Sequence, residues 1–221
     1  MFWKKWITDI KEKTANMNKE DTCSYIMTYY WPHMLLGILI IALIFLFGAH
    51  YLFGNKKPVF TCVMPNQKID IERDRKMEET FAKYAELDPK RVDIDSDYNF
   101  SYDDIKLEGV NESGYEKFFL KWRNNELDAV IMSESMYKYC KELGGKFREI
   151  DDTCGFKEYK DEGKCTAVIL GKDSFSKKVN KKEDILLLAF PDNGKHKENS
   201  KKFLKYMKDI YDGKIGGVAY E

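Results

Sequence analysis

The longest run of apolar positions in the chain covers residues 34–53, MLLGILIIALIFLFGAHYLF, and holds no Asp, Glu, Lys or Arg. Twenty helical residues at about 1.5 Å per residue span roughly 30 Å, the thickness of the hydrocarbon core of a bilayer. Aromatic side chains flank the run, as in the aromatic belts of membrane proteins: Tyr29, Tyr30, Trp31 and Tyr51. The alternative, a buried core helix, rarely runs this long without a polar position. We therefore expect a transmembrane helix over 34–53.

Two helical segments are predicted before this span. In residues 1–20 apolar side chains recur at i, i+3, i+4 and i+7, with lysines on the other flank: Trp3, Trp6, Ile7 and Ile10. This pattern is typical of a helix lying in the membrane interface, although a helix packed on a partner protein has the same stripe. Residues 21–33 are expected to form a juxtamembrane helix that Pro32 kinks. The late start of the apolar run favours an uncleaved signal anchor over a cleavable signal peptide.

The rest of the chain alternates short apolar runs with helical patterns. Residues 54–58, GNKKP, are expected to be a linker, and residues 59–221 a separate, highly charged domain. The predicted strands are 59–64, 92–98, 129–132, 165–171 and 184–191. The predicted helices are 75–87, one around 115–122, 133–143 and 196–211. This order predicts an α/β fold with a single mainly parallel sheet and helices on both faces.

Charge excludes one class of partner and leaves the orientation open. The chain carries 37 Lys and Arg against 37 Asp and Glu, so it lacks the net positive charge expected of a nucleic-acid-binding protein. Lysines lie on both sides of the apolar span: Lys4, Lys5, Lys11, Lys13 and Lys19 before it, and Lys56 and Lys57 directly after it. The positive-inside rule therefore does not decide which end is cytoplasmic.

The cysteines offer a possible cross-link. Four lie in the domain and one before the span: Cys62, Cys140, Cys154, Cys165 and Cys23. Outside the cell, Cys154 and Cys165 are the most plausible pair, since a disulfide between them closes a short polar loop. Metal ligation is the rival interpretation, but no Cys-x-x-Cys occurs and the histidine nearest to Cys154 and Cys165 in sequence is His196.

Two stretches resemble extracellular solute-binding proteins of ABC importers. FFLKWRNNELDAVIMSESMYKYCKELGG, residues 118–145, resembles their "GELDVVI"-like turn and strand, and DILLLAFPDNGKHKENSKKFLKYMKDI, residues 184–210, resembles a later helix of theirs. The front end, YIMTYYWPHMLLGILIIALIF, is similar to single-pass clostridial membrane proteins. A full binding protein has two lobes, but only fourteen residues separate Ile150 from Cys165, where the second would be inserted. The resemblance thus implies a single lobe outside the membrane and a cytoplasmic N-terminus.

Sequence motifs for catalysis are missing. The chain contains no Gly-x-Ser-x-Gly, His-Glu-x-x-His, phosphate-loop or dinucleotide fingerprint. Of the three histidines, His33 and His50 flank the membrane span, and His196 opens a helix where it is expected to be solvated. We therefore expect no enzyme activity, no cofactor and no metal.

Candidate binding residues follow from the predicted strand order. Ligands of open α/β sheets settle at the carboxyl ends of the strands, where helix N-termini offer free amides. The polar residues expected at these ends are Asn66, Gln67, Ser96, Asp97, Tyr98, Ser133, Glu134 and Ser135. The alternative interpretation is that they are helix caps and turn residues, for which Ser and Asp are preferred in any case.

Two functional hypotheses from different classes follow. The first is a membrane-anchored extracytoplasmic binding module that recognises a small ligand or a partner protein. The second is a non-catalytic assembly subunit that docks to other membrane proteins. Both include the lipid bilayer as a partner, and neither includes a nucleic acid.

Overall fold

The computed structural model of the chain describes residues 2–53, 57–103, 105–107, 110, 112–173 and 184–215. It divides into two compact units, Met1–Asn55 and Lys56–Glu221, which we describe separately. The division falls within the predicted linker, three of whose residues, 54–56, lie outside the described part of the chain.

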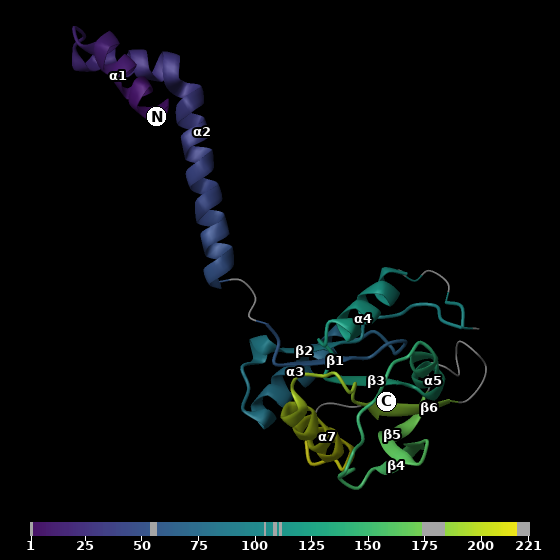
Figure 1. The fold of residues 1–221 in the computed structure, drawn as a ribbon. Helices are drawn as coiled ribbons and strands as arrows, with labels where there is room; N and C mark the ends of the chain where they lie inside the picture. Colours follow the sequence, from purple (N-terminus) through teal and green to yellow (C-terminus); the bar gives the residue numbers. More distant parts are fainter. Residues whose placement is uncertain are drawn as a thin grey trace. The chain divides into compact units, whose positions relative to one another are not determined.

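The first unit is a pair of helices. α1 covers Phe2–Thr14 and α2 covers Lys19–Phe53, so the predicted juxtamembrane and membrane-spanning segments form one continuous helix. The side chain of Asn18 begins α2 by accepting a hydrogen bond from the Asp21 amide at 2.7 Å. α1 folds back along the first part of α2, and α2 bends before its apolar part (Figure 1). Pro32 inside α2 accounts for such a bend.

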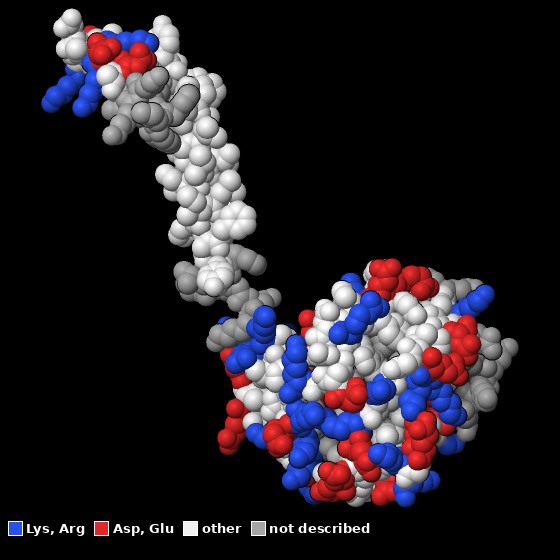
Figure 2. All heavy atoms as spheres, viewed as in Figure 1, with Lys and Arg blue, Asp and Glu red and all other residues white. Residues whose placement is uncertain are grey.

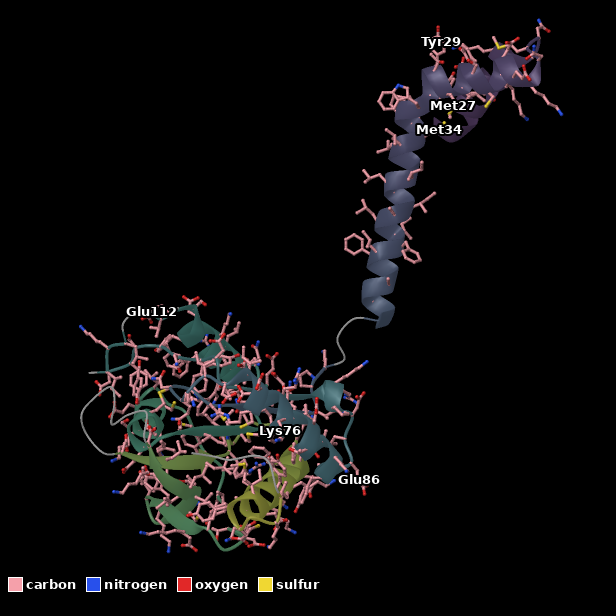
Figure 3. All side chains as sticks on the ribbon, turned by 180° about the vertical axis from the view of Figure 1, so that it is seen from behind. Met27, Tyr29, Met34, Lys76, Glu86 and Glu112 are labelled. Carbon is pink, nitrogen blue, oxygen red and sulfur yellow. The ribbon has the colours of Figure 1, made fainter. Side chains whose placement is uncertain are left out.

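A hydrogen bond between Tyr30 and Asp9 joins the two helices. The Asp9 carboxylate pairs with Lys13 at 3.0 Å and accepts a hydrogen bond from the Tyr30 hydroxyl at 3.3 Å. Tyr30 is 8% exposed, whereas Met27, Tyr29 and Met34, which are 41–65% exposed, project from the helix (Figure 3). The predicted stripe on α1 rests largely on the side chains of Trp3, Trp6 and Ile7, which lie outside the described part of the structure.

The apolar part of α2 is largely exposed within the first unit. The helix is long and apolar enough to cross a membrane over Lys19–Ala49, and the most apolar part of it is not buried. Phe45 and Phe47 are 74% and 72% exposed. Figure 2 shows this stretch without charged residues. Exposed apolar patches of this size are rare on soluble proteins.

The second unit is built on one six-stranded sheet. Its strands are β1 (Phe60–Val63), β2 (Val92–Asp95), β3 (Ala129–Ser133), β4 (Lys157–Asp161), β5 (Lys164–Asp173) and β6 (Asp184–Ala189). Its helices are α3 (Ile71–Ala85), a 3-10 turn η1 (Pro89–Arg91), α4 (Ser113–Arg123), α5 (Glu134–Glu142) and α7 (Lys197–Tyr211). The strand order is β2-β1-β3-β6-β5-β4.

The sheet is mostly antiparallel, so the prediction of a mainly parallel sheet is wrong in that respect. β1 pairs parallel with β2 and β3, but the β3–β6, β6–β5 and β5–β4 pairs are antiparallel. The reason lies in the connections. Only ten residues join β5 to β6, and a parallel return needs a crossover of a dozen or more.

One strand, β4, was not predicted from the sequence pattern. β4 lies within the polar stretch 148–164, which carries no apolar run. It is an edge strand, and charged side chains are common on edges because they discourage pairing with other chains. Glu162 and Gly163, with φ of 51° and 82°, form the turn to β5, as expected of a tight hairpin.

The helices cover both faces of the sheet, with a separate core on each (Figure 1). Successive strand residues point to opposite faces, so Ala129 and Ile131 enter the core under α3 and α7, while Val130 and Met132 enter the core under α4 and α5. The first core is centred on an aromatic cluster with ring centroids 4.8–5.1 Å apart: Phe60, Phe81 and Phe203.

Candidate functional site

Asn66, which follows β1, fastens a loop. Its backbone adopts a left-handed conformation with φ of 52°, which Asn tolerates better than most residues. Its Nδ2 donates to the carbonyl of Phe100 at 2.9 Å, and its Oδ1 accepts from the Phe100 amide at 2.9 Å. Both polar atoms of the side chain are thus engaged, and Asn66 is buried as part of the frame.

Ser96, which follows β2, joins the sheet to α3. It is fully buried, and both its amide and its hydroxyl donate to the Asp74 carboxylate. Asp74 is itself 6% exposed and pairs with Arg73 at 2.9 Å. The Asp74–Arg73 pair was not predicted. Acidic residues are common in the first turn of a helix, where they are usually exposed to solvent, so the sequence gave no sign that Asp74 is buried.

The neighbouring candidates Asp97 and Tyr98 also serve the local structure. The Asp97 amide donates to Asp95 Oδ1 at 2.8 Å in a turn, and its side chain is exposed. Tyr98 is buried, with the Lys121 ammonium 5.7 Å from its ring centroid, and burial raises the pKa of its hydroxyl. Lys121 comes from α4 and pairs with Asp93 at 2.8 Å, so these contacts hold α4 to β2.

The residues after β3 form a different arrangement. Ser133 caps α5 by accepting from the Met136 amide at 3.2 Å. Its Oγ also lies 3.0 Å from Ser135 Oγ and 3.2 Å from the Tyr102 hydroxyl, which in turn lies 2.9 Å from Ser135 Oγ. We refer to Tyr102, Ser133 and Ser135 as the hydroxyl cluster. Ser133 is therefore a cap, as the sequence indicated, and a member of this cluster as well.

Two carboxylates lie beside the hydroxyl cluster. Asp184 accepts from the Ser135 amide at 3.1 Å and is paired with Asp173 across the β5–β6 ladder. Asp173 is 2% exposed, and its Oδ1 lies 3.5 Å from Nε2 of Gln67, the residue after Asn66. Burial raises the pKa of Tyr102, and the negative charges of both aspartates raise it further. The structure thus brings Gln67, the hydroxyl cluster and two aspartates together at the carboxyl end of β3.

Glu134 stands next to this group and is more accessible. It pairs with Lys138 at 2.6 Å, one turn along α5, and accepts a hydrogen bond from Tyr159 of β4 at 3.2 Å. The pKa of Tyr159 is raised by burial and by the charge of Glu134. Four of the eight candidates therefore lie together at the carboxyl end of β3: Gln67, Ser133, Glu134 and Ser135. The other four support the surrounding loops: Asn66, Ser96, Asp97 and Tyr98.

His196 is partly exposed, and its side chain is also hydrogen-bonded. Its Nδ1 lies 2.9 Å from Oδ2 of Asp128, which is 2% exposed. The Asp128 carboxylate also accepts from the amides of Thr61 at 3.1 Å and His196 at 2.8 Å. These bonds join β1, the start of β3 and the start of α7, so the pair has a structural role. The sequence predicted a solvated imidazole and gave no sign of this partner, because the carboxylate is 68 residues away in the sequence.

All five cysteines are free thiols in the structure. Cys154 Sγ lies 4.0 Å from the carbonyl of Asp152, and Cys165 Sγ lies 3.6 Å from that of Ala167. The Cys154–Cys165 disulfide is not formed here and stays a prediction for the oxidised protein. Among the described residues, no group of three or more His, Cys, Asp or Glu side chains is placed to hold a metal ion.

Comparisons with protein-family models, with curated proteins and with solved structures found no match to this chain. Hydroxyl groups both donate and accept hydrogen bonds, and ionised carboxylates accept them. An edge that combines these groups is suited to holding a polar ligand by hydrogen bonds.

Proposed function

We propose that this protein is a single-pass membrane protein whose α/β domain is a binding module for a polar ligand. The anchor is supported by the length, hydropathy and bare apolar surface of α2. The resemblance of residues 118–145 and 184–210 to solute-binding proteins favours an extracytoplasmic domain with a cytoplasmic N-terminus. The same resemblance favours a role in binding rather than in catalysis.

The hydroxyl cluster carries this proposal. Tyr102 lies in a loop, Ser133 ends β3 and Ser135 begins α5, yet their three oxygens lie within 2.9–3.2 Å of one another. They meet at the carboxyl end of β3, the edge at which α/β sheets bind ligands. Tyr102 and Ser133 are buried, whereas Ser135 and Asp184 are partly exposed and can face a ligand. Ligands with hydroxyl or amine groups match this set of donors and acceptors.

A thermal-shift screen of the full chain in lipid nanodiscs tests the proposal. Sugars, amino acids and short peptides are the probes, and a bound compound should raise the melting temperature of the domain. Ser135→Ala should weaken the effect of an active compound by about three- to tenfold in affinity, since one hydrogen bond contributes about 1 kcal/mol. Ser24→Ala, an exposed serine on α2, is the matched control and should leave affinity unchanged.

Failure of every probe, together with a membrane protein that co-purifies with the chain, would favour the assembly-subunit hypothesis instead. Orientation has its own test. Cys23 lies before the span and is exposed. With an impermeant thiol reagent applied to intact cells, Cys23 should stay unlabelled. Labelling of Cys23 from outside would reverse the proposed topology.

A further inference from the structure

The sheet ends at β4, which is an edge strand. β4 is the last strand in the order β2-β1-β3-β6-β5-β4, and β5 is its neighbour on the inner side (Figure 1). Among the residues that the structure describes, none outside the β4–β5 hairpin forms a hydrogen bond with the β4 backbone. An edge of this kind can add a strand, because the outward amide and carbonyl groups of an edge strand are available for pairing.

The other edge of the sheet, β2, already has partners within the chain. The Ile94 amide donates to the Glu78 carboxylate of α3 at 2.9 Å. The Lys121 ammonium of α4 pairs with Asp93 of β2 at 2.8 Å. Side chains from α3 and α4 therefore cover β2, which makes β4 the edge better suited to adding a strand.

The order of charges along β4 is complementary to a second copy of the same strand. β4 reads Lys157-Glu158-Tyr159-Lys160-Asp161, with Tyr159 at its centre. Two copies laid antiparallel about a twofold axis at Tyr159 place Lys157 of one copy opposite Asp161 of the other. The same arrangement places Glu158 opposite Lys160. Every charged residue of the strand then faces an opposite charge, and such cross-strand pairs stabilise antiparallel sheets.

The two inner charges are the more accessible ones. The side chains of Glu158 and Lys160 are 48% and 61% exposed and lie 3.1 Å apart on one face of β4. On the other face, Lys157 is exposed, but Asp161 is partly buried and pairs with Lys141 at 2.8 Å. Glu158 and Lys160 can therefore reach a second copy at little cost, since an exposed pair contributes little to stability.

The centre of the strand is held in place by α5. The Tyr159 ring packs against Tyr137 with centroids 5.3 Å apart, and its hydroxyl donates to Glu134 at 3.2 Å. The bulge in this hairpin lies in β5, where Thr166 has no opposite residue, so β4 keeps an unbroken alternation of side chains. A strand that is already ordered loses little conformational entropy when it pairs.

The same charges select the partner. Charged side chains keep an edge from pairing with most strands, because like charges or apolar groups would face them. A strand whose charges complement its own sequence admits a second copy of itself. Such a twofold contact closes after two copies, since each β4 edge is used once.

We propose that β4 pairs antiparallel with β4 of a second copy of this chain, which joins two six-stranded sheets into one continuous sheet. A five-residue strand buries less area than a stable dimer needs, so the pairing is weak in dilute solution. Copies held in one bilayer by the anchor proposed above meet at a high effective concentration, which favours a weak contact. The pairing does not depend on what the hydroxyl cluster binds.

Energy transfer between donor- and acceptor-labelled copies of the full chain in liposomes tests the pairing, with the dyes attached at the N-terminus. Glu158→Lys and Lys160→Glu should each weaken association by about tenfold, because like charges then face each other at both symmetry-related contacts. The double variant should recover wild-type association. A mixture of the two single variants should also associate, since their charges complement each other. Glu198→Lys, at a position 82% exposed on α7, is the matched control and should have no effect.

Three results would overturn the proposal: no association of the wild-type chain, equal association in all variants, or single variants that neither the double variant nor the mixture restores. Equal association would place the contact elsewhere, for example along α2. Unchanged melting temperatures should show that the variants are folded. Flotation with the liposomes tests the anchor on its own, and the same ranking of variants is expected in detergent solution at higher protein concentration. Failure of the anchor and failure of the pairing are therefore distinguishable.

Discussion

Several single residues in this domain determine how closely two segments of the chain approach each other. Gly194 lies between β6 and α7, and a Cβ added to it would lie 2.8 Å from the carbonyl oxygen of Leu127. Ser96 and Asp128 act in a similar way through hydrogen bonds, since each connects a strand to the start of a helix. At these positions the side chain, or its absence, sets how closely two segments approach.

Gly194→Ala is expected to lower the free energy of unfolding by about 1–3 kcal/mol, the usual cost of overpacking. The clash is with backbone, which cannot rotate away as a side chain can. Gly114→Ala is the matched control: its Cβ would meet nothing closer than 3.6 Å, and it lies in α4. That variant should be neutral or stabilise by about 0.5–1 kcal/mol. Urea unfolding of both variants checks the pair; equal losses would contradict the expectation.

At the scale of elements, local signals were enough where an element carries its own periodicity. β1, β3, α5 and α7 lie where the apolar pattern placed them, and α2 follows from composition alone. β4 could not be found in this way, because its charged side chains belong to an edge and its partner strand supplies its order. The turn at Glu162 and Gly163 was its one local signal, and an Asp-Glu-Gly sequence is weaker evidence for a hairpin than Asn-Gly.

Glu162→Asn is expected to stabilise this hairpin. Glu162 has φ of 51°, a conformation in which Asn is favoured over Glu, and Asn-Gly is the preferred pair for such a turn. The gain should be a few tenths to about 1 kcal/mol, reduced slightly by loss of the exposed contact with Lys141 at 3.5 Å. Amide hydrogen exchange in β4 and β5 should slow. Gly163→Ala, at φ of 82°, should have the opposite effect, and faster exchange in Glu162→Asn would contradict the argument.

At the scale of the whole molecule, stability depends on how the domain holds its many charges. Lys, Arg, Asp and Glu are interspersed over the face in view (Figure 2), so screening limits most pairs. Glu78 is an exception. Burial raises the pKa of its carboxyl group, although the Ile94 amide donates to it at 2.9 Å, and Asp93, Asp74 and Asp95 raise the pKa further.

This shift has a definite sign. Because the folded-state pKa of Glu78 lies above its unfolded value of about 4.5, its contribution to stability is full below that value. The contribution is lost as the pH rises through the folded pKa. Glu78→Gln keeps an acceptor for Ile94 and removes the charge, so it should be more stable than wild type at pH 7, with the difference shrinking toward pH 4. Urea unfolding at both pH values checks this; a difference that grows on acidification would contradict it.

The sequence by itself determined the elements whose cause is local: the apolar span, the alternating strands and amphipathic helices of an α/β domain, and the capping role of Ser133. Only the tertiary structure decided the antiparallel half of the sheet, the engagement of His196 by Asp128, and which candidates gather at one edge. The physical reason is distance along the chain. Periodicity and capping act over a few residues, whereas the contact between Gln67 and Asp173 joins residues 106 positions apart. Such partners are chosen by the packing of the whole sheet.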